Sequence, residues 1–299
     1  MQKVMIFGSG YLGLHLADAL LNSGVTVGAL TKNPILGARL KKRGISEVIV
    51  NQLESKSWHS EISGDYTNIV NCVSSSGGGI SGYKKSYVQG QSSIIEWAKN
   101  QSIEQIIYTS STSVYEQNNG SWVDESSIKS TDSISEIASL LRHAEELISD
   151  NSSFFKSHYI LRLSGIYGPK RHYLLDRIKS EGEIYGAGHY YMNMIYVEDI
   201  VKVILNIIFN KNKVESGIFN LTDDLPVEKS VVVDWLSKRL NLRVPEFNQS
   251  IRFKGLSQRK RIPKDRKISN AKLKKEFGIS FDYPTYREGY GNLIDLGES

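Results

Sequence analysis

Short apolar runs and helical apolar patterns alternate along the first half of the chain. The short runs, which are typical of strands buried on both faces of a sheet, occupy residues 4–7, 25–30, 48–50, 68–73 and 105–109. Between the first two runs, Leu12, Leu16 and Leu20 recur at helical spacing, and a second helix is predicted near residues 91–100. Strands that alternate with helices predict a parallel sheet covered by helices on both faces.

The second half of the chain has a less regular pattern. Two further strands are predicted at residues 159–163 and 217–221, and a helix at residues 227–240. The stretch 245–284 is basic and mixed in pattern, and we expect it to belong to a smaller lobe that closes over the carboxyl ends of the strands. Ligands of open α/β sheets bind at that edge.

The composition is typical of a globular protein. The chain has 299 residues, of which 40% are hydrophobic and 23% charged, so we expect about two folded domains. No apolar run approaches the roughly 20 residues that span a bilayer. Cys72 is the single cysteine, which excludes an internal disulfide, and residues 1–3 lead into a strand pattern rather than a signal peptide. We therefore expect a cytoplasmic protein without a membrane segment.

Positive charge is concentrated near the C-terminal end. The formal net charge is +5, and the segment 252–267 is rich in Arg and Lys, with Asp265 as its one acid. No DNA- or RNA-binding motif accompanies this segment, so no nucleic-acid partner is expected. The segment is either a loop that holds a phosphorylated small molecule or a solvated surface loop.

A G-x-G-x-x-G pattern links the first predicted strand to the first predicted helix. In this context the pattern is typical of dinucleotide binding, and the alternative is a glycine-rich turn without a ligand. Gly8 would allow the tight turn, Gly10 the approach of a pyrophosphate, and Gly13 the close packing of helix and strand. Tyr11 and Leu12 begin the helix, whose N-terminus would hold the anion.

The end of the second predicted strand points to the type of dinucleotide. Sites for NAD normally place an acid there, about 20 residues after the first glycines. This chain has Thr31 and Lys32 instead, and its next acid is Glu47. Lys32 would pair with the 2′-phosphate of NADP, with Arg39 as a second cation, and its alternative role is that of an exposed loop cation. We therefore expect NADP as the cofactor, with NAD as the second candidate.

Further motifs follow the predicted strands at ordered intervals: YTSSTSVY at 108–115, LRLSGIYGP at 161–169, MIYVEDI at 194–200 and FNLTDDLP at 219–226. Together they resemble the extended short-chain dehydrogenase/reductase superfamily, in its NAD-dependent epimerase/dehydratase branch, over nearly the whole chain. The resemblance implies that Ser111 hydrogen-bonds a substrate oxygen and that Tyr167 lies beside the nicotinamide. Tyr115 and Tyr167 are the candidate proton donors. The residues implied beside the adenosine half of the cofactor are Asn71, Cys72 and Val73.

The family's Tyr-x-x-x-Lys pair, in which the Tyr transfers the proton and the Lys lowers its pKa, is missing. On the predicted helix around residues 134–145, Ile137 and Leu141 stand at the two positions, and neither side chain can transfer a proton. Arg142 on the same helix is a candidate contact to the cofactor phosphate or ribose. His143 is either a substitute proton carrier or a surface histidine.

We therefore expect an α/β fold, a Rossmann-type doubly wound parallel sheet with a smaller discontinuous C-terminal substrate lobe. Residues 1–168 would form the dinucleotide-binding domain, joined by a strand near 217–222, and residues 169–299 mainly the substrate-binding lobe. The expected function is that of an NAD(P)-dependent oxidoreductase or epimerase/dehydratase-type enzyme acting on a small polar substrate such as a nucleotide sugar. The alternative, favoured by the missing pair, is a non-catalytic NADP(H)-binding sensor or scaffold protein. No metal site is expected, because the histidines lack paired ligand spacing; a homodimer is one of the open oligomeric states.

Overall fold

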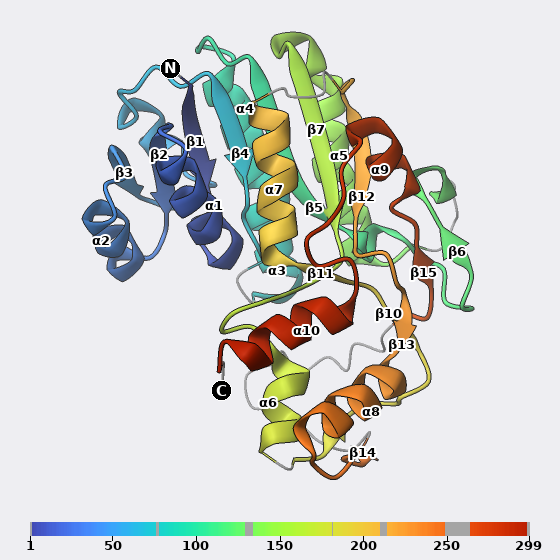
Figure 1. Ribbon diagram of the computed structural model, residues 1–299. Helices are drawn as coiled ribbons and strands as arrows, with labels where there is room; N and C mark the ends of the chain where they lie inside the picture. Colours follow the sequence, from blue (N-terminus) through green and yellow to red (C-terminus); the bar gives the residue numbers. More distant parts are fainter. Residues whose placement is uncertain are drawn as a thin grey trace. The chain divides into compact units, whose positions relative to one another are not determined.

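A seven-stranded sheet with the strand order β12-β7-β5-β4-β1-β2-β3 organises the computed structural model (Figure 1). The structure describes residues 2–75, 78–128, 134–180, 182–209, 214–248 and 264–297. The strands of this sheet are β1 (Lys3–Phe7), β2 (Thr26–Thr31), β3 (Glu47–Val50), β4 (Asn68–Asn71), β5 (Gln105–Ser111), β7 (Ser157–Leu163) and β12 (Gly217–Leu221). Neighbouring strands from β3 to β5 pair in parallel. The predicted α/β fold class and its parallel sheet are confirmed.

Helices cover both faces of this sheet. Their bounds are α1 (Tyr11–Asn22), α2 (Pro34–Lys42), α3 (Gly79–Tyr83), a π-helix (Lys84–Gln89), α4 (Gly90–Ala98), α5 (Glu136–Asp150) and α7 (Val197–Ile208). Figure 1 shows α1 and α7 in front of the sheet and α4 and α5 behind it. α1 buries Leu12, Leu16 and Leu20, which share one face because they are four residues apart.

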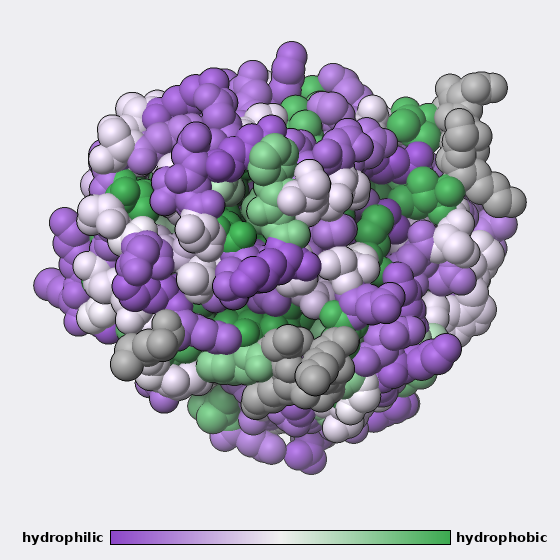
Figure 2. Space-filling model, turned by 90° about the horizontal axis from the view of Figure 1, so that it is seen from above, coloured by the Kyte–Doolittle hydropathy of each residue, from purple (hydrophilic) through white to green (hydrophobic). Residues whose placement is uncertain are grey.

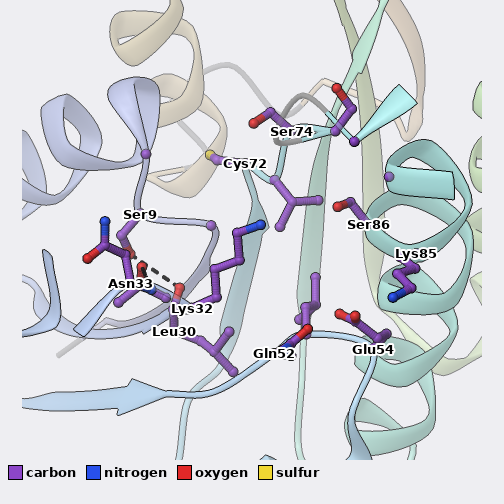
Figure 3. Close-up of a pocket in the computed structure, with 18 of the residues that line it drawn as sticks. Ser9, Leu30, Lys32, Asn33, Gln52, Glu54, Cys72, Ser74, Lys85 and Ser86 are labelled. Atoms are coloured by element: carbon purple, nitrogen blue, oxygen red, sulfur yellow. Dashed lines mark hydrogen bonds between the residues drawn. The ribbon is translucent and has the colours of Figure 1, made fainter. Parts of the chain in front are cut away.

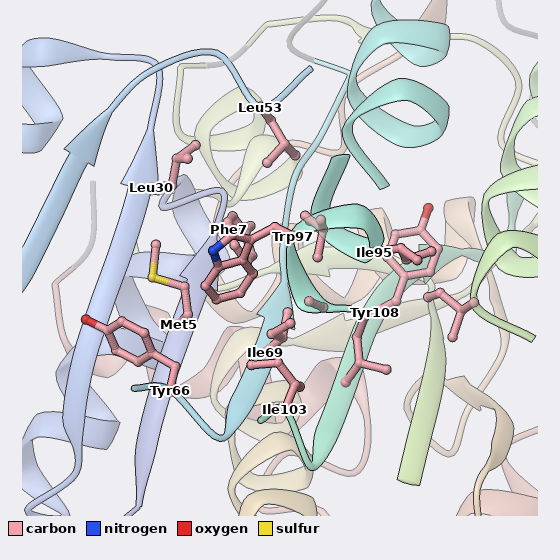
Figure 4. Packing of buried hydrophobic residues seen from close by; sticks show 14 of the residues in the cluster. Met5, Phe7, Leu30, Leu53, Tyr66, Ile69, Ile95, Trp97, Ile103 and Tyr108 are labelled. Carbon is pink, nitrogen blue, oxygen red and sulfur yellow. The ribbon is translucent and has the colours of Figure 1, made fainter. Parts of the chain in front are cut away.

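A core cluster fills the space between the sheet and the helices behind it. Phe7 at the end of β1 packs against Trp58 and Trp97, with ring centroids 5.0 and 5.8 Å apart. Figure 4 shows Phe7 and Trp97 together with Ile69 of β4 and Tyr108 of β5, all of them in this cluster. The packing holds the carboxyl ends of these strands in place, and the candidate site is built there.

The chain divides into two compact units, and each is made of three segments. Unit 1 comprises Met1–Val114, Thr131–Arg162 and Val201–Phe219; unit 2 comprises Tyr115–Ser130, Leu163–Ile200 and Asn220–Ser299. Unit 2 is therefore discontinuous in sequence, as the predicted fold class requires. Nearly all of the seven-stranded sheet belongs to unit 1.

Unit 2 combines short strands with helices around its own core. Its strands are β6 (Trp122–Val123), β8 (Gly165–Tyr167), β9 (Ile184–Tyr185), β10 (Tyr191–Met192), β11 (Met194–Tyr196), β13 (Val227–Glu228), β14 (Phe247–Asn248) and β15 (Lys267–Ile268). Its helices are α6 (Tyr173–Lys179), α8 (Lys229–Leu240), α9 (Ala271–Phe277) and α10 (Tyr286–Asp295). Tyr167, Tyr196 and Tyr290 belong to its core cluster. The helix predicted at 227–240 begins two residues later as α8, because β13 pairs with β10.

The basic segment is only partly described, since residues 249–263 lie outside the described part of the chain. Its described end is bound within unit 2: Lys264 forms an ion pair with Glu116, and the Asp265 carboxylate accepts a hydrogen bond from the amide of Tyr191 at 2.9 Å. In the face shown in Figure 2, hydrophilic residues predominate and hydrophobic areas between them are smaller. Among the described residues, no helix has the length and apolar character needed to cross a membrane.

Candidate functional site

The turn between β1 and α1 packs tightly against the end of β4. Gly8 has a φ of +90°, and a Cβ added there would lie 2.6 Å from the amide nitrogen of Val73. A Cβ at Gly13 would lie 2.4 Å from the carbonyl oxygen of Gly8. The packing of the protein itself therefore requires both of these glycines.

Gly10 has no such neighbour. It is exposed at the N-cap of α1, and a Cβ added there would meet no heavy atom within 4 Å. No side chain caps this helix, whose first amides have no intrahelical partners. Such a helix end attracts anions through its dipole and its amide groups. The turn therefore offers open space and unpaired amide groups that suit an anion.

A pocket of about 420 Å³ opens beside the turn, a volume within the usual range for small-molecule sites. Its walls come from the β1–α1 turn, the carboxyl ends of β2, β3 and β4, and the segment of α3 and the π-helix (Figure 3). Every lining residue belongs to unit 1. The lining residues that the sequence predicted are Gly8, Gly10, Thr31, Lys32, Cys72 and Val73.

Lys32 is exposed at the end of β2, and Figure 3 shows its side chain extending among the pocket residues. The backbone around it is well defined by hydrogen bonds. The Thr31 hydroxyl accepts one from the amide of Asn33 at 3.2 Å, and Asn33 in turn caps α2 by accepting from the amides of Ile35 and Leu36 at 3.0 and 3.2 Å. Lys32 is thus an exposed cation, and hydrogen bonds hold the backbone next to it.

The residues at the end of β4 pack against the β1–α1 turn. Asn71 is fully buried, its amide donates to Gln91 at 2.8 Å, and its side-chain oxygen accepts from the amide of Val73 at 3.1 Å. Asn71 therefore shapes the loop, whereas Cys72 and Val73 reach the pocket. Burial raises the pKa of the Cys72 thiol to about 12, so it is a neutral wall group.

Some predicted cofactor residues lie outside the pocket lining. Leu12 and Gly13 are buried in the packing of α1, and the ring of half-buried Tyr11 packs edge-on against His15 at 4.9 Å. Arg142 on α5 donates two hydrogen bonds to the carbonyl oxygen of Val114, at 3.2 and 2.8 Å. Their predicted contacts to a cofactor therefore stay predictions.

Ser111 ends β5 and is half-buried. Its hydroxyl oxygen accepts a hydrogen bond from the amide of Ser113 at 3.1 Å, inside the short 3₁₀ turn Thr112–Val114. On α5, Ile137 is half-buried and Leu141 fully buried. His143 is exposed, with its ring nitrogen 3.5 Å from the Glu146 carboxylate, as the surface alternative requires.

The two candidate tyrosines lie in unit 2, each in a packed environment. Tyr115 is fully buried, and its hydroxyl donates to the side-chain oxygen of Asn220 at 2.6 Å. Tyr167 is 4% exposed and donates to the carbonyl oxygen of Thr285 at 3.4 Å. Burial, followed by the charge of Asp223, raises the pKa of Tyr167 far above its usual range. In these surroundings both hydroxyls serve packing and hydrogen bonding within unit 2.

Sequence patterns predicted six of the 21 residues that line the pocket and missed the others. The missed polar residues include Asn51, Gln52 and Glu54 after β3, and Ser81, Lys85 and Ser86 on α3 and the π-helix. A signal existed for the second group, since residues 74–82 are unusually rich in Ser and Gly. Only the parallel sheet brings the end of β3 to the same edge, so no local motif marked the first group.

Comparisons with known proteins agree with this geometry. The sequence profile of the NAD dependent epimerase/dehydratase family matches residues 4–222. Protein YeeZ of Escherichia coli (strain K12) is 25% identical over 294 residues, which cover 95% of this chain and 97% of YeeZ.

Solved structures show the same fold. A conserved protein of unknown function from Silicibacter pomeroyi has a TM-score of 0.75 at 21% identity, with 100% of both chains covered. The UDP-glucuronic acid 4-epimerase from Bacillus cereus, in complex with NAD, has a TM-score of 0.78 at 17% identity, with 99% of each chain covered.

Proposed function

The chain belongs to the NAD dependent epimerase/dehydratase family, and on this premise we propose that it binds a nicotinamide dinucleotide in the pocket of unit 1. We propose further that it acts as an NAD(P)-dependent oxidoreductase or epimerase-type enzyme on a small polar substrate such as a nucleotide sugar. One observation carries the proposal: the space at Gly10 is open, although the glycines on either side of it in the motif are closely packed.

The residues around this space suit the parts of a dinucleotide. The N-terminus of α1 would hold the pyrophosphate next to Gly10, and Cys72 and Val73 would line the adenosine half. The chemistry that the bound cofactor supplies is the reversible transfer of a hydride. The protein positions the cofactor, excludes water and supplies groups for the substrate.

NADP is the proposed preferred form. The charged lining residues are Lys32, Lys85 and Glu54, so the lining is net positive by one charge. Lys32 stands where an NAD site would hold the ribose hydroxyls with an acid. Glu47, the first acid after β2, is engaged away from the pocket: burial would raise its pKa, but hydrogen bonds from Ser63 and Gly64 lower it.

Ser111 would hydrogen-bond the substrate oxygen at which charge develops. Because Ile137 and Leu141 cannot exchange protons, the proton would pass to water or to a group that the substrate brings. The complex of the Bacillus cereus UDP-glucuronic acid 4-epimerase with NAD supports a nucleotide sugar as the substrate class.

Calorimetric titration with NADP and NAD tests the binding proposal, with Gly10→Val as the key variant. A Cβ at this position has no heavy atom of the packed protein within 4 Å, so the variant should fold like the wild type and lose dinucleotide binding, because the side chain would occupy the place of the pyrophosphate. Gly13→Ala is the contrasting variant, since it should lose stability through its contact with Gly8. Unchanged NADP affinity in folded Gly10→Val would refute the assignment.

Turnover separates the enzyme from the second candidate, a non-catalytic NADP(H)-binding sensor or scaffold. The second candidate is favoured by the apolar pair Ile137 and Leu141. NADPH oxidation should be followed with aldehydes, ketones and nucleotide sugars, in the wild type and in Ser111→Ala. The enzyme predicts turnover that falls in Ser111→Ala. Tight dinucleotide binding with no turnover across the panel would support the sensor instead.

A further inference from the structure

Two side chains of α5 form hydrogen bonds with residues on either side of Ser111. Arg142 donates through Nε and Nη2 to the carbonyl oxygen of Val114, at 3.2 and 2.8 Å. Val114 is the last residue of the 3₁₀ turn Thr112–Val114, within which the Ser113 amide donates to the hydroxyl oxygen of the preceding Ser111 at 3.1 Å. Arg142 therefore acts on the turn that orients the Ser111 side chain.

Glu145 holds the residue just before Ser111. The Ser110 hydroxyl donates to Oε1 of Glu145 at 2.6 Å. The same carboxylate accepts from Arg162 of β7, with Nε to Oε1 at 3.0 Å and Nη2 to Oε2 at 2.7 Å. Ser110, Glu145 and Arg162 are 4%, 4% and 3% exposed, so this is a bidentate ion pair inside the protein.

A buried ion pair of this kind needs an explanation other than stability. Removing two charges from water is costly, and well-packed apolar residues often stabilise a protein equally well. This pair joins the carboxyl ends of two strands to one helix, at the point where Ser111 leaves the sheet. Its geometry restricts how that strand end can move, which apolar packing does less specifically.

We propose that Arg142 and Glu145 are positioning residues. Arg142 holds Val114 and Glu145 holds Ser110 by hydrogen bonds, and together they fix the orientation of the Ser111 hydroxyl. α5 lacks the Tyr and Lys of the family pair, yet Arg142 and Glu145 lie three residues apart and thus on neighbouring parts of one helix face. The helix acts on the substrate through Ser111 and not through a proton carrier of its own. The assignment rests on the proposed function only for the claim that Ser111 contacts substrate.

The direct test measures hydrogen exchange of the Ser113 amide by NMR in the full chain. Arg142→Met removes the grip on Val114, and Ser110→Ala removes the link to Glu145 while leaving the ion pair intact. Each variant should speed exchange of this amide by about tenfold, the loss of about one net hydrogen bond. Ser111→Ala removes the acceptor and gives the upper limit, and Arg142→Lys, which keeps one donor, should restore part of the protection.

Arg43→Met is the matched control, since exposed Arg43 pairs with Asp18 on the surface and should leave Ser113 unchanged. Where a substrate is found, Arg142→Met should lower kcat per folded molecule by about tenfold, with the folded fraction measured by circular dichroism, and Arg142→Lys should restore part of the lost turnover. Ser113 exchange at the wild-type rate in both Arg142→Met and Ser110→Ala would overturn the proposal. Absence of wild-type turnover would contradict only the proposed enzymatic function, because the exchange measurement needs no substrate.

Discussion

Gly8 and Gly10 are two residues apart in one motif, yet only the first is required by the fold. The positive φ of Gly8 and its contact with Val73 leave no room for a side chain, whereas the space at Gly10 is empty of protein atoms. Gly10 is therefore the position of the motif where a ligand can approach the backbone, as the G-x-G-x-x-G pattern predicts. At the residue scale, the open space at Gly10 supports the prediction that the motif makes.

Lys32 should decide between the two dinucleotides. Replacing it by methionine, Lys32→Met, should weaken NADP binding by about tenfold or more, since a hydrogen bond to a charged group contributes about 1.5–3 kcal/mol. NAD affinity should change little, because NAD has no 2′-phosphate. Calorimetry with both cofactors measures this, with Arg43→Met as the control, since Arg43 is an exposed cation that pairs with Asp18 and lies outside the pocket lining. Equal wild-type affinity for NADP and NAD would contradict the assignment.

Asp223 in unit 2 is a buried acid with an unusual setting. It is 1% exposed, and its Oδ2 atom lacks a hydrogen-bond partner among the described residues. Burial raises its pKa well above the usual range, and the charges of Asp224, Asp199 and Glu288 act in the same direction. Because its pKa is raised, Asp223 keeps its proton to a higher pH in the folded protein than in the unfolded chain.

Asp223→Asn should change how stability depends on pH. Because the folded-state pKa is raised, the wild type loses stability as pH rises above about 4, by up to about 1.4 kcal/mol per pH unit. The variant keeps the acceptor oxygen and loses the charge, so its advantage over the wild type should be greater at pH 8 than at pH 5. Urea unfolding at both pH values measures this. The control is Asp18→Asn, which removes an ion pair with Arg43 in unit 1 and should not reproduce the pattern; a pH profile identical to wild type in Asp223→Asn would contradict the argument.

At the scale of elements, periodicity predicted the strands and helices that bury a continuous apolar face. β1, α1, β2 and β5 all appeared close to their predicted bounds, because burial of the sheet dictates their patterns. Elements set by other causes were not predicted. The π-helix Lys84–Gln89 depends on a backbone hydrogen-bond register that apolar spacing does not encode, and it places Lys85 and Ser86 in the pocket.

α5 shows the same limit for the candidate site. The sequence located Ile137 and Leu141 and, through the resemblance, the missing pair. It did not show that Arg142 donates to the carbonyl oxygen of Val114, or that Glu145 forms an ion pair with Arg162, because both contacts join separate segments of the sequence. Local patterns therefore predicted which helix carries Ile137 and Leu141. Only the tertiary structure shows which residues Arg142 and Glu145 contact.

Restoring the family pair on α5 should not restore the family chemistry. Leu141 is fully buried, so the double change Ile137→Tyr with Leu141→Lys places an ammonium group in the protein interior, where burying a charge is costly. We expect the free energy of unfolding to fall by about 2 kcal/mol or more and native turnover not to rise. Denaturant unfolding and NADPH oxidation measure both, with Ile137→Tyr alone as the control because Ile137 is only half-buried. A several-fold rise in turnover at unchanged stability would contradict this expectation.

For the whole molecule, the chain passes between its two units several times. Residues 115–130 belong to unit 2 although they begin only four residues after the end of β5, and Val201–Phe219 belongs to unit 1 although most of its sequence neighbours belong to unit 2. Local pattern records the order of elements along the chain but not which distant segments pack together. The division of labour between units, dinucleotide in unit 1 and substrate in unit 2, accordingly stays a prediction.

Hydrogen exchange with mass spectrometry tests this division in one molecule. NADP should slow exchange at the β1–α1 turn, the ends of β2, β3 and β4, and the π-helix, since every residue that lines the pocket belongs to unit 1. At a ligand concentration of 100 times Kd, local opening that releases the ligand should slow by about a hundredfold. UDP-glucuronic acid added next should protect segments of unit 2, if the substrate is a nucleotide sugar. Gly10→Val should lose the first effect while its free exchange pattern stays that of the wild type. Protection by NADP confined to unit 2 would move the cofactor site away from the glycine turn, and no effect of UDP-glucuronic acid on the NADP-bound protein would exclude this compound as the substrate.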